Sequence, residues 1–168
     1  KLDAYGNVSW QKTFGGANTD GASSIIQTSD GGFAVAGLTY SAGAGLADAW
    51  VLKLDALGNV LWQKTFGGAS DDYAYSIVQT SDGGFAVAGQ TGSFGAGGSD
   101  LWVLKLDASG AVSWQKTFGG ASTDEAYSIA QTTDGGYAVA GYTASGAAIT
   151  DFWVLKLDAS GNVTWQKT

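Results

Sequence analysis

Apolar and polar residues alternate in short runs along the whole chain, and glycine-rich turns separate the runs. In Phe85–Gly89 large side chains alternate with alanine, and in Val112–Phe118 apolar side chains alternate with polar ones. This period of two is typical of β-strands. Leu101–Leu106 is almost continuously apolar, which indicates a strand covered on both faces. No window shows a convincing helical period with caps, so the pattern predicts an all-β protein.

The pattern is repeated at a fixed spacing. Its copies are offset by 52, 52 and 51 residues, and the last 13 residues, Lys156–Thr168, match the first 13, Lys1–Thr13, with two differences. Among the repeated elements, Trp-Gln-Lys-Thr begins at Trp10, Trp62, Trp114 and Trp165, and Trp-Val-Leu begins at Trp50, Trp102 and Trp153. The 168 residues are therefore three repeats and a duplicated end rather than one irregular domain.

Each repeat predicts four short strands. Turns such as Ser81–Gly84 and Asp107–Gly110 join them, since Asp starts turns and Gly supplies positive φ. Four-stranded meanders at this period are typical of β-propeller blades, whose stacking buries both faces of each sheet. We therefore predict three four-stranded antiparallel blades of β-propeller type and an extra N-terminal outer strand at Val8–Phe14. An open stacked array of β-meanders is the alternative.

The predicted division is residues 1–22 as the unpartnered outer strand and loop, 23–70 as blade 1, 71–122 as blade 2 and 123–168 as blade 3. Three blades are too few for an ordinary closed propeller, so exposed sheet edges are expected to pair with something. The extra strand either completes a blade in a neighbouring chain or marks the point where a longer array was cut. Because the chain starts at Lys1, we expect a processed chain or a piece of a longer one.

The repeats resemble the β-propeller repeats of secreted and surface proteins of bacteria and archaea. The matching residues in the second copy are Phe66–Gly68, Asp72, Ile77, Asp82–Phe85, Gly89–Thr91 and Asp100–Gly110. The resemblance covers essentially the whole chain. It implies an extracellular or cell-surface setting and a scaffold, adhesion or binding role. The copies are nearly identical and lack Pro, which indicates recent duplication or a design built on a consensus.

Composition excludes several kinds of chemistry. The chain has no His, Cys, Met, Arg or Pro, and its net charge is -7. Catalytic triads, thiolate nucleophiles, structural zinc sites and guanidinium clamps are therefore ruled out. An acidic chain without Arg does not suit nucleic acid, and no apolar run is long enough to insert in a membrane. The lack of cysteine does not decide the compartment.

The aspartates are the candidates for chemistry. Asp20, Asp72 and Asp124 recur 52 residues apart, and a ring could bring their oxygens to one calcium ion. Capping of loop backbone is the favoured interpretation, because Asx turns are common. The same interpretation is favoured for the aspartates that precede the aromatic strands, Asp48, Asp100 and Asp151. We therefore predict no metal, cofactor or catalytic residue.

Three further features allow a functional or a structural interpretation. Asp71 and Asp72 could be a glycosidase pair, but neighbours on a strand point to opposite faces. The loops Tyr40–Ala47, Gly92–Ser99 and Ala144–Thr150 differ most between copies; drift is favoured over ligand binding. The tryptophans could form a sugar-binding platform or belong to the core. The core is favoured for Trp50, Trp102 and Trp153. Both positions remain open for Trp10, Trp62, Trp114 and Trp165.

These observations predict a non-enzymatic structural repeat unit of an extracellular or cell-surface protein, in a longer array or a self-assembling oligomer or filament. The expected partners are other copies or neighbouring repeats, with a glycan or protein ligand as a further possibility. A surface adhesion module that binds glycan or protein is one alternative, and a designed symmetric propeller is another. A hydrolase with Asp acid and base groups is the weakest alternative, because no carboxylate pair is distinctively placed.

Overall fold

The chain folds into three antiparallel sheets of four strands, and in each sheet the strands pair in chain order. The computed structural model describes residues 1–144 and 150–168. Sheet 1 consists of β1 (Asp20–Gln27), β2 (Phe33–Thr39), β3 (Asp48–Leu54) and β4 (Val60–Phe66). Sheet 2 consists of β5 (Asp72–Gln79), β6 (Phe85–Thr91), β7 (Asp100–Leu106) and β8 (Val112–Phe118). Sheet 3 consists of β9 (Asp124–Gln131), β10 (Tyr137–Ala144), β11 (Thr150–Leu157) and β12 (Val163–Lys167).

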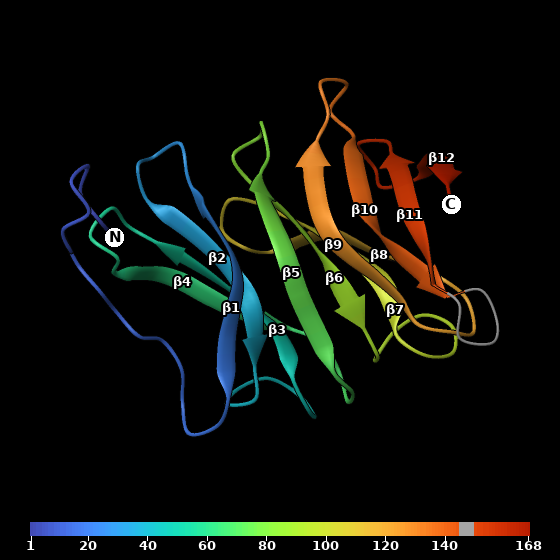
Figure 1. The fold of residues 1–168 in the computed structure, drawn as a ribbon, viewed down its shortest axis with the longest axis horizontal. Coiled ribbons are helices and arrows are strands. Elements are labelled where there is room, and N and C mark those ends of the chain that lie inside the picture. Colours follow the sequence, from blue (N-terminus) through green and yellow to red (C-terminus); the bar gives the residue numbers. More distant parts are fainter. Residues whose placement is uncertain (145–149) are drawn as a thin grey trace.

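The sheets follow one another in space as they do along the chain. Figure 1 shows them side by side, with the N-terminus at one end of the row and the C-terminus at the other. The first strands of the sheets lie next to each other, β1 beside β5 and β5 beside β9. The all-β fold and the four-stranded repeats predicted from the sequence are confirmed, and the described residues contain no helix.

The two faces of each sheet differ in side-chain size. In sheet 2 one face, named here the large face, carries Ile77, Phe85, Val87, Trp102, Leu104 and Leu106. The opposite face, named the small face, carries Val78, Ala86, Ala88, Leu101 and Val103. The alternation follows from the period of two in a strand, which places neighbouring residues on opposite faces.

The predicted outer strand at Val8–Phe14 is wrong. Before β1 the described pairing is an isolated bridge between Leu2 and Val8, and residues 9–14 run without strand pairing. The equivalent strands β4 and β8 pair with β3 and β7 of their own sheets. Among the described residues no strand equivalent to β3 or β7 lies beside residues 9–14, so their backbone has no sheet to join. The strand pattern in this segment is therefore not sufficient to form a strand.

The boundary predicted at residue 23 also differs from the structure. β1 begins at Asp20, so residues 20–22 belong to sheet 1 and not to the N-terminal segment. Asp20 is aligned with Thr39 of β2, and its carboxylate accepts a hydrogen bond from the Thr39 hydroxyl. The strand pairing therefore begins three residues before the predicted boundary.

Candidate functional site

The interface between neighbouring sheets is the feature that repeats with the sequence. The large face of sheet 2 packs on the small face of sheet 1, which contributes Ala34, Ala36, Ala49 and Val51. The large face of sheet 3 packs in the same way on the small face of sheet 2 and contributes Ile129, Tyr137, Val139, Trp153, Leu155 and Leu157. Alanines let the two backbones approach closely, and the bulky side chains opposite fill the space. Equivalent residues thus build the same interface twice.

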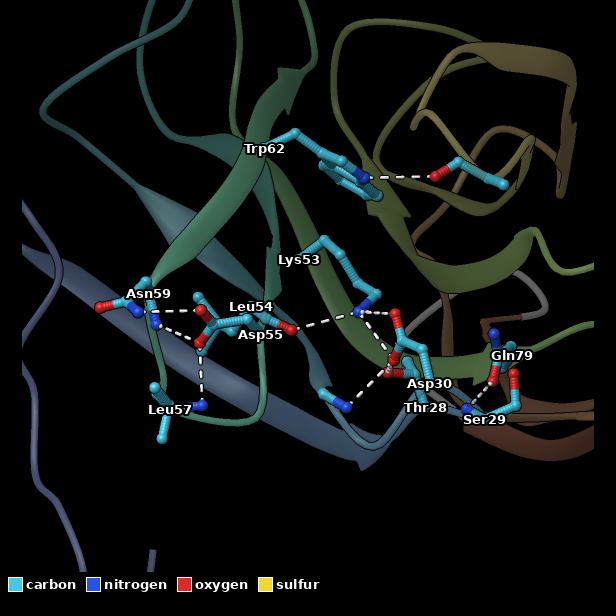
Figure 2. Close-up of polar contacts among 12 residues, drawn as sticks. Thr28, Ser29, Asp30, Lys53, Leu54, Asp55, Leu57, Asn59, Trp62 and Gln79 are labelled. Atoms are coloured by element: carbon cyan, nitrogen blue, oxygen red, sulfur yellow. Dashed lines mark hydrogen bonds and ion pairs between the residues drawn. The ribbon is translucent and has the colours of Figure 1, made fainter.

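The last strand of sheet 1 and the last strand of sheet 2 each carry a tryptophan that reaches the next sheet. The Trp62 indole N–H donates to the Ala108 carbonyl at 3.2 Å (Figure 2). The Trp62 ring meets Phe85 edge-on, with ring centroids 5.8 Å apart. The ring also lies over Gly110, where a Cβ would come within 2.9 Å of it. Trp114 makes the equivalent edge contact with Tyr137. Trp62 and Trp114 therefore lie between two sheets. The sequence left their position open between the core and a sugar-binding surface.

A glutamine adds a polar contact to each interface. The Gln79 side-chain oxygen accepts the backbone N–H of Ser29 at 2.8 Å (Figure 2). Gln131 accepts the N–H of Ser81 at the same distance. Sequence reasoning missed these glutamines, because nothing within one repeat indicates a partner in another. Their conserved spacing of 52 residues between copies is the signal that could have found them.

Inside each sheet a lysine closes the turn that carries the Asp-Gly-Gly sequence. The Lys53 ammonium lies 2.8 Å from Asp30 and donates to the Leu54 carbonyl (Figure 2), and Lys105–Asp82 and Lys156–Asp134 are equivalent pairs. The lysine hydrogen bond is the main cause that lowers the pKa of Asp82 to about 2. Asp30 and Asp134 have pKa values lowered for the same reason. These carboxylates therefore stay charged and hold a turn.

The first group of candidate aspartates caps loops. Asp72 accepts hydrogen bonds from the Gly68 N–H at 2.9 Å, from the Ser93 hydroxyl at 2.6 Å and from the Thr91 hydroxyl. Asp20 has the equivalent partners in sheet 1, and Asp124 accepts the Gly120 N–H at 3.0 Å. The position equivalent to Ser93 in the third copy is residue 145, which lies outside the described residues. Among the described residues no cluster of three or more potential ligands could hold a metal ion.

Two of the second group of candidate aspartates, Asp48 and Asp100, lie at the interfaces. Asp48 and Asp100 are buried, and each accepts one loop N–H at 2.8 and 2.9 Å respectively. Burial raises the pKa of both carboxyls, and the negative charges of Asp72 and Asp124 add to the effect. Asp151, their equivalent in sheet 3, is exposed. Each interface thus includes a carboxylate held at some electrostatic cost.

The adjacent carboxylates Asp71 and Asp72 do not converge on one space. Asp71 accepts the Ala47 N–H at 3.2 Å and the Tyr40 hydroxyl at 3.3 Å, whereas Asp72 is directed to its own loop. A glycosidase needs two carboxyl groups that face one bond. The pair is therefore engaged in two separate loops.

The first two variable loops lie against the segments that join neighbouring sheets. Gly45 approaches the backbone of Ala69, and Gly97 approaches that of Ala121, so the first two loops touch the segment that leads into the next sheet. The loop predicted at Ala144–Thr150 lies outside the described residues at positions 145–149. No helix in the described part of the chain is long and apolar enough to cross a membrane.

The two ends of the row leave half of the interface uncovered. Ile25, on the large face of sheet 1, is 60% exposed, whereas its equivalents Ile77 and Ile129 are 3% and 6% exposed. Phe152, on the small face of sheet 3, is 71% exposed, whereas its equivalent Leu101 is fully buried. We name these surfaces the open large face of sheet 1 and the open small face of sheet 3. Sequence reasoning predicted open edges but did not identify the faces or their residues.

The N-terminal segment lies on the open large face. The Trp10 indole N–H donates to the Ala56 carbonyl at 3.2 Å, and its ring meets Phe33 edge-on at 5.7 Å. The ring covers Gly58, and Lys12 donates to the Asn59 side chain at 2.6 Å. Trp62 makes the same contacts as Trp10 with the equivalent residues of sheet 2, Ala108, Phe85 and Gly110. Trp10 therefore stands where the last strand of a preceding sheet would place its tryptophan.

Comparison with known proteins identifies no family for the chain. No family model matches the chain, and no curated protein matches it. Among solved structures, a protein of unknown function from Bacteroides caccae is similar, with 13% sequence identity and a TM-score of 0.39. The match covers 98% of this chain and 72% of that one.

Proposed function

We propose that the chain is a non-enzymatic structural repeat unit of an extracellular or cell-surface protein, built of β-propeller-type blades that join further blades. The observation that carries the proposal is the repeated interface, formed twice by equivalent residues and left half-formed at both ends of the row. Repeat proteins bury a continuous core by stacking units of this kind. The extracellular setting is supported by the resemblance of the repeats to those of exported proteins.

The chemistry of the described carboxylates supports a structural role. Asp20 and Asp72 use their oxygens to cap loops, and Asp30 and Asp82 hold ion pairs inside the sheets. The sequence has no His, Cys or Arg to supply another reactive group. The side chains that vary least between copies thus serve turns and interfaces.

Adding a fourth repeat tests the proposal. A chain extended by one more copy of residues 118–168 gains an interface, so its free energy of unfolding and its urea m-value both rise. Urea denaturation of the three-repeat and four-repeat chains measures the gain. The matched control is the four-repeat chain with Phe152→Asp in the new interface, which loses most of it. A four-repeat chain no more stable than the three-repeat chain would contradict the proposal.

Binding of a glycan is a second candidate function, favoured by a row of tyrosines along the first strands. The rings of Tyr75 and Tyr127 are 5.3 Å apart and those of Tyr127 and Tyr142 are 5.9 Å apart. Glu125 accepts both the Tyr127 and the Tyr142 hydroxyls. Aromatic rings beside an acceptor suit a sugar. A glycan array tests this function. Saturable binding that is lost in Tyr127→Ala would support it, and binding that is unchanged in Tyr127→Ala would contradict it.

A further inference from the structure

The open large face of sheet 1 contains a groove. On the large faces of sheets 2 and 3 the neighbouring sheet fills the equivalent space. Lys12 and Phe14 on one side and Gly37, Trp50 and Leu52 on the other line a space of about 180 Å³. In sheet 2 the equivalent large-face residues are packed against the alanines and Val51 of sheet 1. The groove is therefore the place where the small face of another sheet fits.

The open small face of sheet 3 has the composition of that missing surface. Ala138, Ala140 and Val154 are equivalent to Ala34, Ala36 and Val51, which are fully buried in the first interface. In sheet 3 these three residues are half-buried, and Phe152 protrudes beside them. The two open faces are thus the two halves of one interface, at opposite ends of the row (Figure 1).

We propose that the open small face of sheet 3 docks on the open large face of sheet 1 of a second copy of the chain, head to tail. The argument is continuity, since the same pair of faces already meets twice within the molecule. Because the two surfaces differ, the contact is heterologous and leaves one of each free on a dimer. The inference rests on the proposed function as a repeat unit and adds its partner and its surface.

Docking places two tryptophans in competition for one position. Trp165 is equivalent to Trp62, is 48% exposed, and would reach Ala56 and Gly58 of the second copy. Trp10 of that copy already contacts both residues. The N-terminal segment must therefore move away when a second copy docks, and it weakens the association by competing.

Substitutions at two exposed residues test the head-to-tail geometry. Ile25→Asp disables the open large face and Phe152→Asp disables the open small face, and a charge at the centre of such an interface weakens it by roughly 30-fold or more. Sedimentation velocity over a concentration series, in salt that screens the charge of -7, should show each variant as a monomer. An equimolar mixture of the two should form dimers and nothing larger, because each retains one working face. Circular dichroism checks that both variants fold.

The Trp10→Ala variant distinguishes a chain that associates weakly from a chain that does not associate. Loss of the competing ring should tighten association by up to about tenfold. If the Trp10→Ala variant associates and adding Trp165→Ala removes that association, the proposal is supported. This holds even where the unmodified chain stays monomeric. Monomers of both the unmodified chain and Trp10→Ala at every concentration would overturn it, as would single Asp variants that still associate. If the four-repeat chain is nevertheless more stable, the repeat-unit function stands and the further blades belong to the same chain.

Discussion

At the scale of single residues, Gly89 shows how closely the strands of one sheet approach. A Cβ at Gly89 would lie 1.8 Å from the backbone oxygen of Tyr73, and the pairing of β5 with β6 shifts by one residue next to it. The obstacle is backbone and cannot rotate away. We predict that Gly89→Ala lowers the free energy of unfolding by about 3 kcal/mol, as overpacking does. Urea denaturation measures the loss.

Gly120→Ala is the matched control for this prediction. A Cβ at Gly120 meets nothing within 4 Å, and its φ is not positive. This substitution should change the free energy of unfolding by no more than about 0.5 kcal/mol. Equal losses at both positions would mean that the close approach at Gly89 is not the cause.

The ion pair of Lys105 and Asp82 predicts a dependence on pH. The lysine holds the pKa of Asp82 at about 2, below the ordinary value of 3.8. A lowered pKa contributes stability above pH 3.8, and this contribution is lost as the pH falls to about 2. In Lys105→Met the pKa of Asp82 rises, so less stability is lost over that range. Because Asp82 is 63% exposed, the difference is at most about 1 kcal/mol.

Denaturation by urea at pH 4 and at pH 2 measures this difference. Lys116→Met is the control, since the Lys116 ammonium binds the uncharged Asn162 side chain and its charge is only a minor cause of the lowered pKa of Asp158. The acid-side loss in this control should therefore stay close to that of the unmodified chain. A Lys105→Met variant with the same loss as the control would show that the lysine does not set the pKa of Asp82.

At the scale of the strand, the last strands of sheets 1 and 2 each stabilise the next sheet. Trp62→Ala removes the edge contact with Phe85 and the hydrogen bond to Ala108, and should lower the free energy of unfolding by about 3 kcal/mol. Trp165→Ala changes the equivalent residue in β12, which is 48% exposed, and should cost less than about 1 kcal/mol. Urea denaturation of dilute protein compares the two. Similar losses would place the role of the tryptophan within its own sheet.

The strands could be predicted from the sequence because their causes lie within one repeat. The period of two in Phe85–Gly89 and the turn at Ser81–Gly84 are local, and the structure forms β6 and its turn there. Val8–Phe14 has the same local pattern as β4 but no neighbouring strand to pair with, so the local pattern fails. The contact of Gln79 with Ser29 joins different repeats, and no pattern within a repeat contains it.

At the scale of the molecule, burial decreases from the middle of the row to its ends. Every residue of β6 and of β7 is buried, whereas every residue of β12 is exposed. Sheet 2 is covered on both faces, and sheets 1 and 3 each leave one face open. In repeat proteins each unit is stabilised by its neighbours, so the middle unit opens last.

Hydrogen exchange should therefore be slowest in β6 and β7 and fastest in β12. Mass spectrometry of peptides from the exchanging protein measures this order, at a dilution where copies of the chain do not meet. In the four-repeat chain the open small face of sheet 3 becomes covered, so protection of β10 and β11 should rise toward that of β6 and β7. Protection that is uniform in the three-repeat chain would mean that the sheets open as one unit. The extension changes sheet 3 by burying its open small face. If protection in sheet 3 is the same in the three-repeat and four-repeat chains, covering that face contributes no stability.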